Sequence, residues 1–363
     1  MPKKLKTIAS FIVPYLQYLN EHSELTQPFP DFVTPSLLVD LYKRMTLLRV
    51  FDNQMVNLHR TGRIGTFPSS LGQEGVFIPV GLALQKDDIF CPFYRDHGVL
   101  IQRGYALTDI LAYWAGDERG NAASAAQRDF PVCVPIATQC LHAAGAAYAV
   151  KYRAEKRVVL TQIGDGGTSK GDFYEALNLA GAWHLPIVFV IDNNQWAISV
   201  PRQKQSASET LAQKAFAAGL DCIQVDGNDS IAMLDVAQHA IAQARNGGKA
   251  TVIEAVTYRL ADHTTVDDAS RYSDPEEKKS AWKKEPIARL GYYLEAQGLW
   301  DKEKETELQH TTKAYVEAEI ERYFAEPKQN PESIFDTMYA VLPEAYVEQR
   351  DDLLRTISEK SEK

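Results

Sequence analysis

The sequence predicts an α/β protein built on a parallel sheet that is flanked by helices. Two apolar runs, Val158 to Ile163 and Ile187 to Ile191, have the length and the β-branched content of buried strands. The segment between them carries apolar or aromatic residues at helical spacing, namely Phe173, Leu177, Ala180 and His184. A strand, a helix and a second strand in this order predict a βαβ unit, whose two strands run parallel and end at the same edge of the sheet.

Polar residues follow both of these strands at the point where each strand ends. Gly164-Asp165-Gly166-Gly167 follows the first strand, and Asn193-Asn194 follows the second. Because ligands bind in α/β folds outside the carboxyl ends of the strands, we expect Asp165 and Asn194 to meet there. Their oxygens suit Mg²⁺, which keeps its other positions for water and phosphate. The pattern predicts a metal-bound phosphate ester, with Gly166 and Gly167 leaving room for a diphosphate that the following helix also contacts through its N–H groups.

Each half of this pattern also has a simpler interpretation. Asp-Gly and Asn-Asn are common turn dipeptides, and either alone would merely end a strand. Two other phosphate motifs are excluded, because residues 164–171 lack the Gly-Lys-Ser/Thr order of a P-loop and Ser169 stands where a dinucleotide fingerprint needs its third glycine. The sequence therefore indicates neither a nucleotide kinase nor an ordinary nicotinamide-dependent dehydrogenase.

The rest of the chain divides into three segments. Residues 1–34 lack sustained periodicity and are expected to form an N-terminal arm that lies on a surface or on a partner. Residues 35–272 are expected to form the α/β domain, which begins with a helix from Pro35 toward Arg60. Its four strand candidates are Ile89 to Pro92, Arg157 to Ile163, Ile187 to Ile191 and Thr251 to Tyr258. Residues 273–363 are helical in pattern and heavily charged, and they predict a C-terminal extension rather than an independent domain.

Composition restricts the classes of partner. The chain has 363 residues, long enough for a large core, and 39 Lys and Arg against 48 Asp and Glu give a net charge of −9. This balance argues against nucleic acid or an anionic membrane as the main partner. The four cysteines form no C-x-x-C pair, which favours reduced thiols and a cytoplasmic protein. Pro14 interrupts the apolar stretch near the start, so neither a signal nor a transit peptide is expected, and no run approaches the ~18 apolar residues of a membrane span.

At this point the sequence resembles the thiamine-diphosphate enzymes, whose signature is Gly-Asp-Gly followed downstream by a double Asn, as here from Gly164 to Asn194. More closely, it resembles the α subunit of a two-subunit 2-oxo acid dehydrogenase E1 component. The matching segments cover nearly the whole chain and are Arg60 to Gly65, Tyr94 to Gly98, Ala137 to Gln139, Gly164 to Gly171, and His263. The resemblance implies a thiamine-diphosphate-binding fold of which this chain holds the diphosphate-binding half.

The resemblance also implies roles for individual residues. Mg²⁺ would be held by Asp165, Asn194 and the backbone carbonyl of Trp196. The cofactor would be bound by residues from several segments, namely Tyr94, Arg95, Val134, Ile136, Asp165, Gly166, Gly167, Asn194, Ile198 and His263. His263 would also be catalytic and border the channel of the acyl acceptor, a role for which a near-neutral pKa is suited. A potassium-binding loop would include Cys133, Pro135, Thr138 and Gln139.

Alternatives to three of these assignments come from the residues themselves. Arg95 would suit an ordinary surface ion pair, a lone histidine such as His263 is more often structural or solvated, and Ile198 would suit a core position equally well. One departure from the family pattern is Asp192, which replaces an Arg of the branched-chain enzymes and a Glu or Gln found in many pyruvate enzymes.

The implied reaction is the decarboxylation of a 2-oxo acid and transfer of the acyl group to the lipoyl group of an E2 acyltransferase. A β subunit would supply the activating Glu in an α₂β₂ heterotetramer with active sites between the subunits. Pyruvate is favoured as the substrate, and a branched-chain 2-oxo acid or acetoin is the alternative. A catalytically silent diphosphate-binding subunit is the alternative of a different class, and the intact set of Asp165, Asn194, Arg95 and His263 argues against it.

Overall fold

The computed structural model describes residues 5–336 and 338–361. The chain forms two compact units, Met1–Glu319 and Ile320–Lys363. The first unit holds a sheet whose strands are β1 (Tyr15–Leu16), β2 (Ile89–Cys91), β3 (Val159–Gly164), β4 (Ile187–Asn193), β7 (Asp221–Asp226) and β8 (Thr251–Val256). Their order across the sheet is β1-β7-β8-β4-β3-β2, and every neighbouring pair is parallel. The predicted α/β class with a parallel sheet is confirmed.

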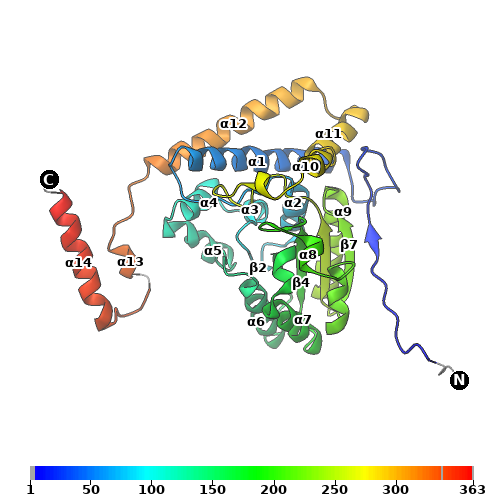
Figure 1. Cartoon of the computed structure of the whole chain (residues 1–363), viewed down its shortest axis with the longest axis horizontal. Coiled ribbons are helices and arrows are strands. Elements are labelled where there is room, and N and C mark those ends of the chain that lie inside the picture. The colour runs from blue at the N-terminus through cyan, green and yellow to red at the C-terminus, as the bar shows by residue number, and fades with distance from the viewer. Residues whose placement is uncertain (1–4, 337, 362–363) are drawn as a thin grey trace. The chain divides into compact units, whose positions relative to one another are not determined.

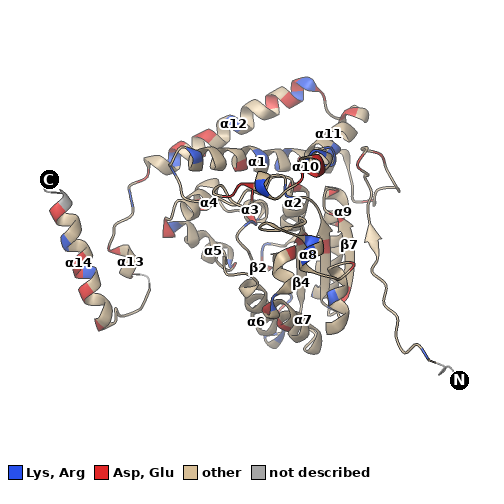
Figure 2. Ribbon diagram, viewed as in Figure 1, with Lys and Arg blue, Asp and Glu red and all other residues tan. Residues whose placement is uncertain are grey.

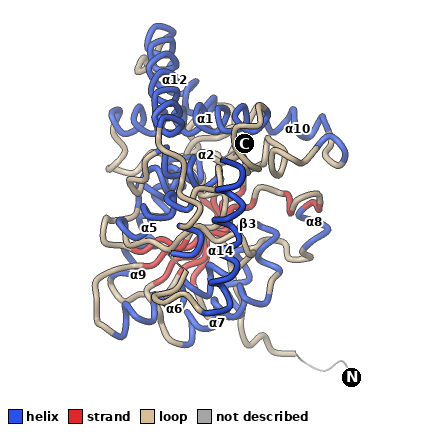
Figure 3. Tube along the Cα trace, turned by 90° about the vertical axis from the view of Figure 1, so that its left-hand side faces the viewer, coloured by secondary structure: helices blue, strands red, loops and turns tan. Residues whose placement is uncertain are grey.

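Helices lie on both sides of this sheet, as Figure 3 shows for the first unit. The α-helices that begin and end within that unit are α1 (Pro35–Arg60), α2 (Glu74–Ala83), α3 (His97–Gln102), α4 (Leu107–Trp114), α5 (Ala122–Gln127), α6 (Thr138–Tyr152), α7 (Gly171–Ala182), α8 (Arg202–Gln205), α9 (Ser230–Arg245), α10 (Pro275–Trp282) and α11 (Pro286–Ala296). Helices α6 and α7 pack together over the sheet face that carries Val159, Ile163 and Phe189, whereas α9 packs against β4, β7 and β8 (Figure 1). The central strands are thus buried on both faces.

Helix α1 begins and runs where the sequence predicts. Thr34 caps it, because its side-chain oxygen accepts a hydrogen bond from the backbone N–H of Leu37 (3.2 Å), and Pro35 occupies the first turn, where no N–H partner is needed. Its apolar stripe includes Leu41, Met45, Leu48, Phe51 and Met55, all fully buried. Helix α1 therefore packs against α2 and α11 as part of the scaffold.

Two strands and one helix end differ from the predictions. The sequence reasoning missed β1, which has two residues, and β7, whose alternating Asp-Cys-Ile-Gln-Val-Asp pattern lacks a continuous apolar run because its first four residues are exposed or half-buried. The expectation that His184 continues the buried stripe of α7 is wrong. The helix ends at Ala182, and His184 is exposed with a positive φ of 48°.

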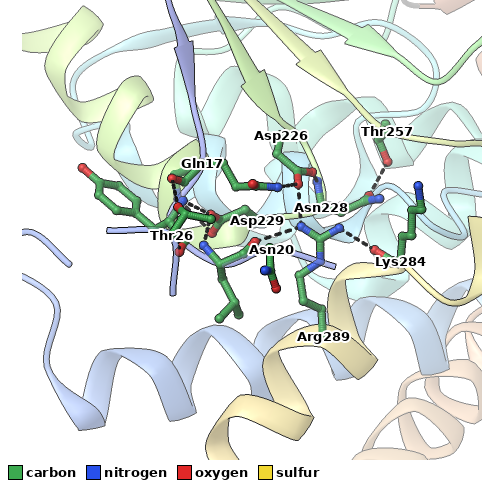
Figure 4. Close-up of polar contacts among 12 residues, drawn as sticks. Gln17, Asn20, Thr26, Asp226, Asn228, Asp229, Thr257, Lys284 and Arg289 are labelled. Carbon is green, nitrogen blue, oxygen red and sulfur yellow. Dashed lines mark hydrogen bonds and ion pairs between the residues drawn. The ribbon is translucent and has the colours of Figure 1, made fainter. Parts of the chain in front are cut away.

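The arm over residues 5–34 is attached to the sheet by polar contacts (Figure 4). One oxygen of Asp229 accepts the backbone N–H groups of Tyr18 (2.6 Å) and Leu19 (2.7 Å), while its other oxygen caps α9. Asp226 accepts hydrogen bonds from Gln17 (2.6 Å) and Arg289 (2.6 Å). The carboxyl end of β7 thus joins the arm to α11.

The remaining helices are α12 (Lys302–Ala325), which crosses from the first unit into the second, and α13 (Ser333–Asp336) and α14 (Glu344–Ser361) in the second unit. Charged side chains are frequent along α12 and α14 and rare on the strands (Figure 2). The predicted boundaries at residues 34 and 272 stay a prediction. Over the described residues, no helix combines the length and the apolar character that a bilayer crossing requires. All four cysteines are free.

Candidate active site

A cavity of about 580 Å³ opens at the carboxyl edge of the sheet. Four strands lead into it. The segment after β2 supplies Tyr94 and Arg95, the turn after β3 supplies Asp165, the residue after β4 is Asn194, and the loop after β8 supplies His263. The register pairs Gly164 of β3 with Asp192 of β4, so these two strands end side by side, as the βαβ pattern predicts. Asp165 and Asn194 line the same cavity.

Asp165 presents a carboxylate oxygen that has no partner. It is buried at the start of the 3₁₀ turn η2 (Asp165–Ser169), and Oδ2 accepts no hydrogen bond from any described residue. Burial raises the pKa of Asp165 to about 6, while the Gly166 N–H and the Arg259 guanidinium act in the opposite direction. A buried carboxylate in this state fits a bound cation, which would replace the lost hydration.

Asn194 is oriented by its neighbours. Its Nδ2 donates to Oε1 of Gln73 (2.8 Å) and, at longer range, to Oδ2 of Asp192 (3.4 Å). Its Oδ1 accepts the backbone N–H of Trp196 (3.2 Å) and keeps a further lone pair. The amide oxygen is thereby fixed on the side away from Gln73 and Asp192, as a metal ligand would need.

The donor set suits Mg²⁺ rather than a metal that requires several charged ligands. Among the described residues no group of three or more His, Cys, Asp or Glu side chains could hold a metal ion. Mg²⁺ is commonly held by one or two carboxylates together with water and phosphate oxygens, so Asp165, Asn194 and the carbonyl of residue 196 suffice. The indole of Trp196 packs against Tyr272, with ring centroids 5.4 Å apart, which leaves its backbone as the part offered to the site.

The packing of the chain itself explains why both residues of the turn after β3, Gly166 and Gly167, are glycines. A Cβ added to Gly166 would lie 2.6 Å from the Cβ of Ala197, and one added to Gly167 would lie 2.5 Å from Cγ1 of Ile163. Real Cβ atoms do not approach so closely. Close packing of the turn therefore favours glycine at both positions, and both also line the cavity, so their predicted contact with a diphosphate stays a prediction.

Arg95 is a buried residue, which excludes the surface ion pair that the sequence left open. Its guanidinium donates to the carbonyl oxygen of Ser69, to the carbonyl oxygen of His263 (3.0 Å) and to Nδ1 of His263 (3.2 Å). It also lies over the ring of Tyr94, 5.4 Å from the centroid. A rigid, permanently charged fork in a cavity wall suits a phosphate group.

His263 differs from its expected protonation. Burial, followed by the charges of Arg95 and Arg259, lowers its pKa to about 3, so the expectation of a near-neutral pKa is wrong for the ligand-free chain. The imidazole is neutral. Its Nδ1 faces donors from Arg95 (3.2 Å) and Arg259 (3.5 Å) and acts as an acceptor, which places the proton on Nε2. His263 is therefore a hydrogen-bond donor through Nε2.

Apolar side chains form the opposite wall. Val134, Ile136 and Ile198 line the cavity, and they are 50%, 42% and 57% exposed. This exposure excludes the core position that the sequence left open for Ile198. Ile198 also has a φ of +56°, a conformation that costs a β-branched residue free energy and recurs at functional sites.

The sequence comparisons agree with this geometry. The profile of the family described as "Dehydrogenase E1 component" matches residues 42–332. The chain belongs to the dehydrogenase E1 component family. The E1 chain is 40% identical to the pyruvate dehydrogenase E1 component subunit alpha of Staphylococcus epidermidis over 321 residues, which are 88% of this chain and 86% of the relative. It is 39% identical to the protein of the same name from Staphylococcus aureus over 337 residues, 92% and 91% of the two chains.

Several side chains of the E1 chain that shape the site were not found by sequence reasoning. Gln73 contacts Asn194 from 121 positions away, whereas Arg259 contacts His263 from four positions away, and no local pattern marks either residue. Asp192, noted in the sequence for its identity alone, is fully buried, and burial raises its pKa to about 7. Asp96, also fully buried, has a pKa raised well above its ordinary value, first by burial and further by Asp192. Two buried acids thus lie close enough to influence each other near Asp165 and Asn194.

The predicted potassium loop lies beside the cavity of the E1 chain. Cys133 and Gln139 line the cavity, and Thr138 begins α6 with its N–H donating to the carbonyl oxygen of Pro135 (3.3 Å). The Oε1 atom of Gln139 is buried and unpartnered among the described residues. A bound potassium ion stays a prediction.

Proposed function

We propose that the E1 chain binds thiamine diphosphate and Mg²⁺ in this cavity and serves as the α subunit of an E1 heterotetramer. The assembly would decarboxylate a 2-oxo acid, with pyruvate favoured, and transfer the acyl group to the lipoyl group of an E2 acyltransferase. The single observation that carries the proposal is the cavity at four strand ends, where the unpartnered Asp165 oxygen, the Asn194 amide oxygen and the Arg95 guanidinium converge.

Each residue has a role that its contacts support. Asp165, Asn194 and the carbonyl of Trp196 would hold Mg²⁺, and Arg95 would bind the diphosphate with Tyr94 beside it. When bound, thiamine diphosphate supplies the nucleophilic carbon that attacks the ketone of the substrate. The apolar side chains of Val134, Ile136 and Ile198 would exclude water from the cavity and fix the orientation of its organic part.

His263 would direct a proton toward the reacting groups. Its Nε2–H donor points away from Arg95 and Arg259, which lie on the Nδ1 side of the ring. The backbone of His263 is anchored, because its N–H donates to Asp267 (2.8 Å) and its carbonyl accepts from Arg95. A fixed donor of this kind can bind a phosphate oxygen or the entering acyl acceptor.

A partner subunit is supported by exposed apolar side chains in the cavity wall and on the helices α6 and α7. Besides Val134 and Ile136, the neighbouring helices α6 and α7 expose Tyr148, Tyr152 and Tyr174, and Trp183 follows α7. Tyr148 stacks with Tyr152 and contacts Trp183, which makes a continuous aromatic patch. Such patches mark interaction sites, and a β subunit that covered Val134 and Ile136 as well as this patch would close the cavity. Its contribution of the activating Glu follows from the family resemblance.

Pyruvate is favoured because both relatives above carry pyruvate dehydrogenase in their names. The test measures carbon dioxide release by co-purified α and β chains with thiamine diphosphate and Mg²⁺, comparing pyruvate, 2-oxoisovalerate and acetoin cleavage. Turnover on pyruvate at least tenfold above the others supports the proposal. Preference for 2-oxoisovalerate or acetoin would replace the substrate, and cofactor binding without any turnover would indicate a silent subunit. The cytoplasmic location stays a prediction.

A further inference from the structure

Lys214 is a buried lysine that contacts the turn carrying Asp165 without lining the cavity. Its Nζ donates to the carbonyl oxygen of Thr168 (2.8 Å) and to the hydroxyl of Thr168 (2.9 Å). That hydroxyl donates in turn to the carbonyl oxygen of Asp165 (2.7 Å). A chain of hydrogen bonds therefore runs from the 3₁₀ helix η3 (Ala212–Ala218) to the backbone of the residue whose carboxylate faces the cavity.

The charge of Lys214 is unusual for its surroundings. The side chain is 7% exposed, Thr168 is fully buried, and the ammonium lies 5.1 Å from the ring centroid of Tyr174. Among the described residues its contacts are with neutral groups, namely two oxygens and one aromatic face. Burying an ammonium without a carboxylate costs free energy, so stability alone would favour an apolar side chain here.

Four consecutive carbonyl oxygens of the turn, those of residues 165 to 168, accept hydrogen bonds. Their donors are the Thr168 hydroxyl, Nε2 of Gln205 (2.7 Å), the N–H of Lys170 (3.0 Å) and Lys214. Residues 164–167, Lys170 and Gln205 line the cavity, whereas Thr168 and Lys214 do not. The contacts of Thr168 and Lys214 thus fix the turn from outside the cavity.

We propose that Lys214 is a positioning residue for the metal and diphosphate site, an inference that rests on the proposed function. It holds the turn so that Asp165 faces Mg²⁺, and it places a fixed positive charge behind the site. A metal-bound diphosphate remains anionic, and a preorganised cation close behind the turn stabilises it without contacting it. The ammonium therefore contributes to ligand binding rather than to the stability of the fold.

The test replaces Lys214 by Met, an unbranched side chain one heavy atom shorter that removes the charge and the donors, in the co-purified α and β assembly. We expect the Kd of thiamine diphosphate at saturating Mg²⁺, measured by titration calorimetry, to rise about tenfold. With cofactor in excess, kcat should stay within about twofold. In the cofactor-free assembly, hydrogen exchange of the peptide covering residues 165–170 should become faster. Lys304→Met, at an exposed lysine that donates to the carbonyl oxygen of Leu299, is the matched control.

Thr168 provides an independent variant for the case in which Lys214→Met does not assemble. Thr168→Val should weaken cofactor binding as Lys214→Met does, and Thr168→Ser, which keeps the hydroxyl, should restore it. Unchanged cofactor affinity and hydrogen exchange in assembled Lys214→Met would overturn the positioning role. So would a loss of affinity that merely follows an equal loss of thermal stability. Failure of the unaltered assembly to bind thiamine diphosphate would instead reject the proposed function, and the hydrogen exchange of the turn would still test the contact.

Discussion

Arg95 contacts His263 at both its ring and its backbone. One guanidinium nitrogen lies 3.2 Å from Nδ1 and 3.0 Å from the carbonyl oxygen of His263. Because a guanidinium does not lose its proton in proteins, Nδ1 is always the acceptor in this pair. The residue proposed to bind the diphosphate therefore also sets the tautomer and the orientation of the residue proposed to donate a proton.

Arg95→Lys is expected to lower the affinity for thiamine diphosphate at least tenfold. A lysine keeps the charge but cannot reach Ser69 and His263 together, since the fork geometry is lost. Titration calorimetry on the assembled subunits measures the change. Arg153→Lys, at an exposed arginine paired with Glu155, serves as the control and should leave the affinity unaltered. An affinity of Arg95→Lys equal to that of the control would contradict the phosphate role.

His263→Ala is expected to impair acylation of the lipoyl group more than carbon dioxide release. The Nε2–H donor is lost while Asp165 and Asn194 remain. Carbon dioxide release with an artificial electron acceptor and lipoyl acylation are measured separately on the same preparation. Equal losses in the two half-reactions would contradict a specific role of His263 in lipoyl acylation.

Asp165→Asn is expected to abolish Mg²⁺-dependent cofactor binding while stabilising the metal-free protein. Burial raises the pKa of Asp165 to about 6, so above pH 6 the ionised carboxylate destabilises the folded protein relative to the unfolded chain. Since one pKa unit corresponds to about 1.4 kcal/mol, the free energy of unfolding at pH 7.5 should rise by about 1 to 3 kcal/mol. Denaturant unfolding without Mg²⁺ measures it. In the unaltered protein Mg²⁺ affinity should fall below pH 6, where a proton competes for the carboxylate.

Ile198→Gly is expected to stabilise the cofactor-free protein by about 1 kcal/mol and to weaken cofactor binding. Glycine relieves the strain of a φ of +56° but removes the apolar side chain from the cavity wall. Arg128→Gly provides a matched control, because Arg128 is exposed and has a φ of 61° away from the cavity. That variant should gain stability and bind the cofactor normally. A destabilised Ile198→Gly protein would show that the turn is not strained.

His97→Gln is expected to make the protein less sensitive to acid. Burial, with a smaller contribution from Arg95, lowers the pKa of His97 to about 3. The unfolded chain takes up a proton near pH 6.5 and the folded chain does not, so stability is present above pH 6.5 and is lost as the pH falls toward 3. Below pH 6.5 the loss is about 1.4 kcal/mol per pH unit. Urea unfolding at pH 7.5 and 5.5 should show a smaller difference in the variant than in His239→Gln, an exposed control.

The sequence predicts much of the sheet but little of the support behind the site. Strand β4 begins as a continuous apolar run and β3 is apolar apart from Thr161 and Gln162; both are buried, and their polar ends mark the cavity. Strand β7 lacks that signal because it lies near the edge, where only the short β1 covers it. Edge strands need fewer apolar residues, so pattern alone does not distinguish them from a loop.

The contacts that orient the residues proposed to bind Mg²⁺ come from remote parts of the chain. Gln73 is 121 positions from Asn194, and Lys214 is 46 positions from Thr168. Their sequence surroundings do not differ from those of ordinary helix or loop residues. The low pKa of His263 has a similar origin, because burial lowers it first and the charge of Arg95 lowers it further from 168 positions away, whereas Arg259 lies only four positions from it.

The hydrogen bonds between the arm and Asp229 also determine when the arm can join the sheet during synthesis. Tyr18 and Leu19 are separated from their carboxylate partner by 211 and 210 residues, so the arm leaves the ribosome long before its binding site exists. Contacts of this span are made late and slowly in folding. During translation the side chains of Tyr18 and Leu19, which are buried in the folded protein, are therefore open to chaperones. The arm can join the sheet only after β7 and the start of α9 have emerged.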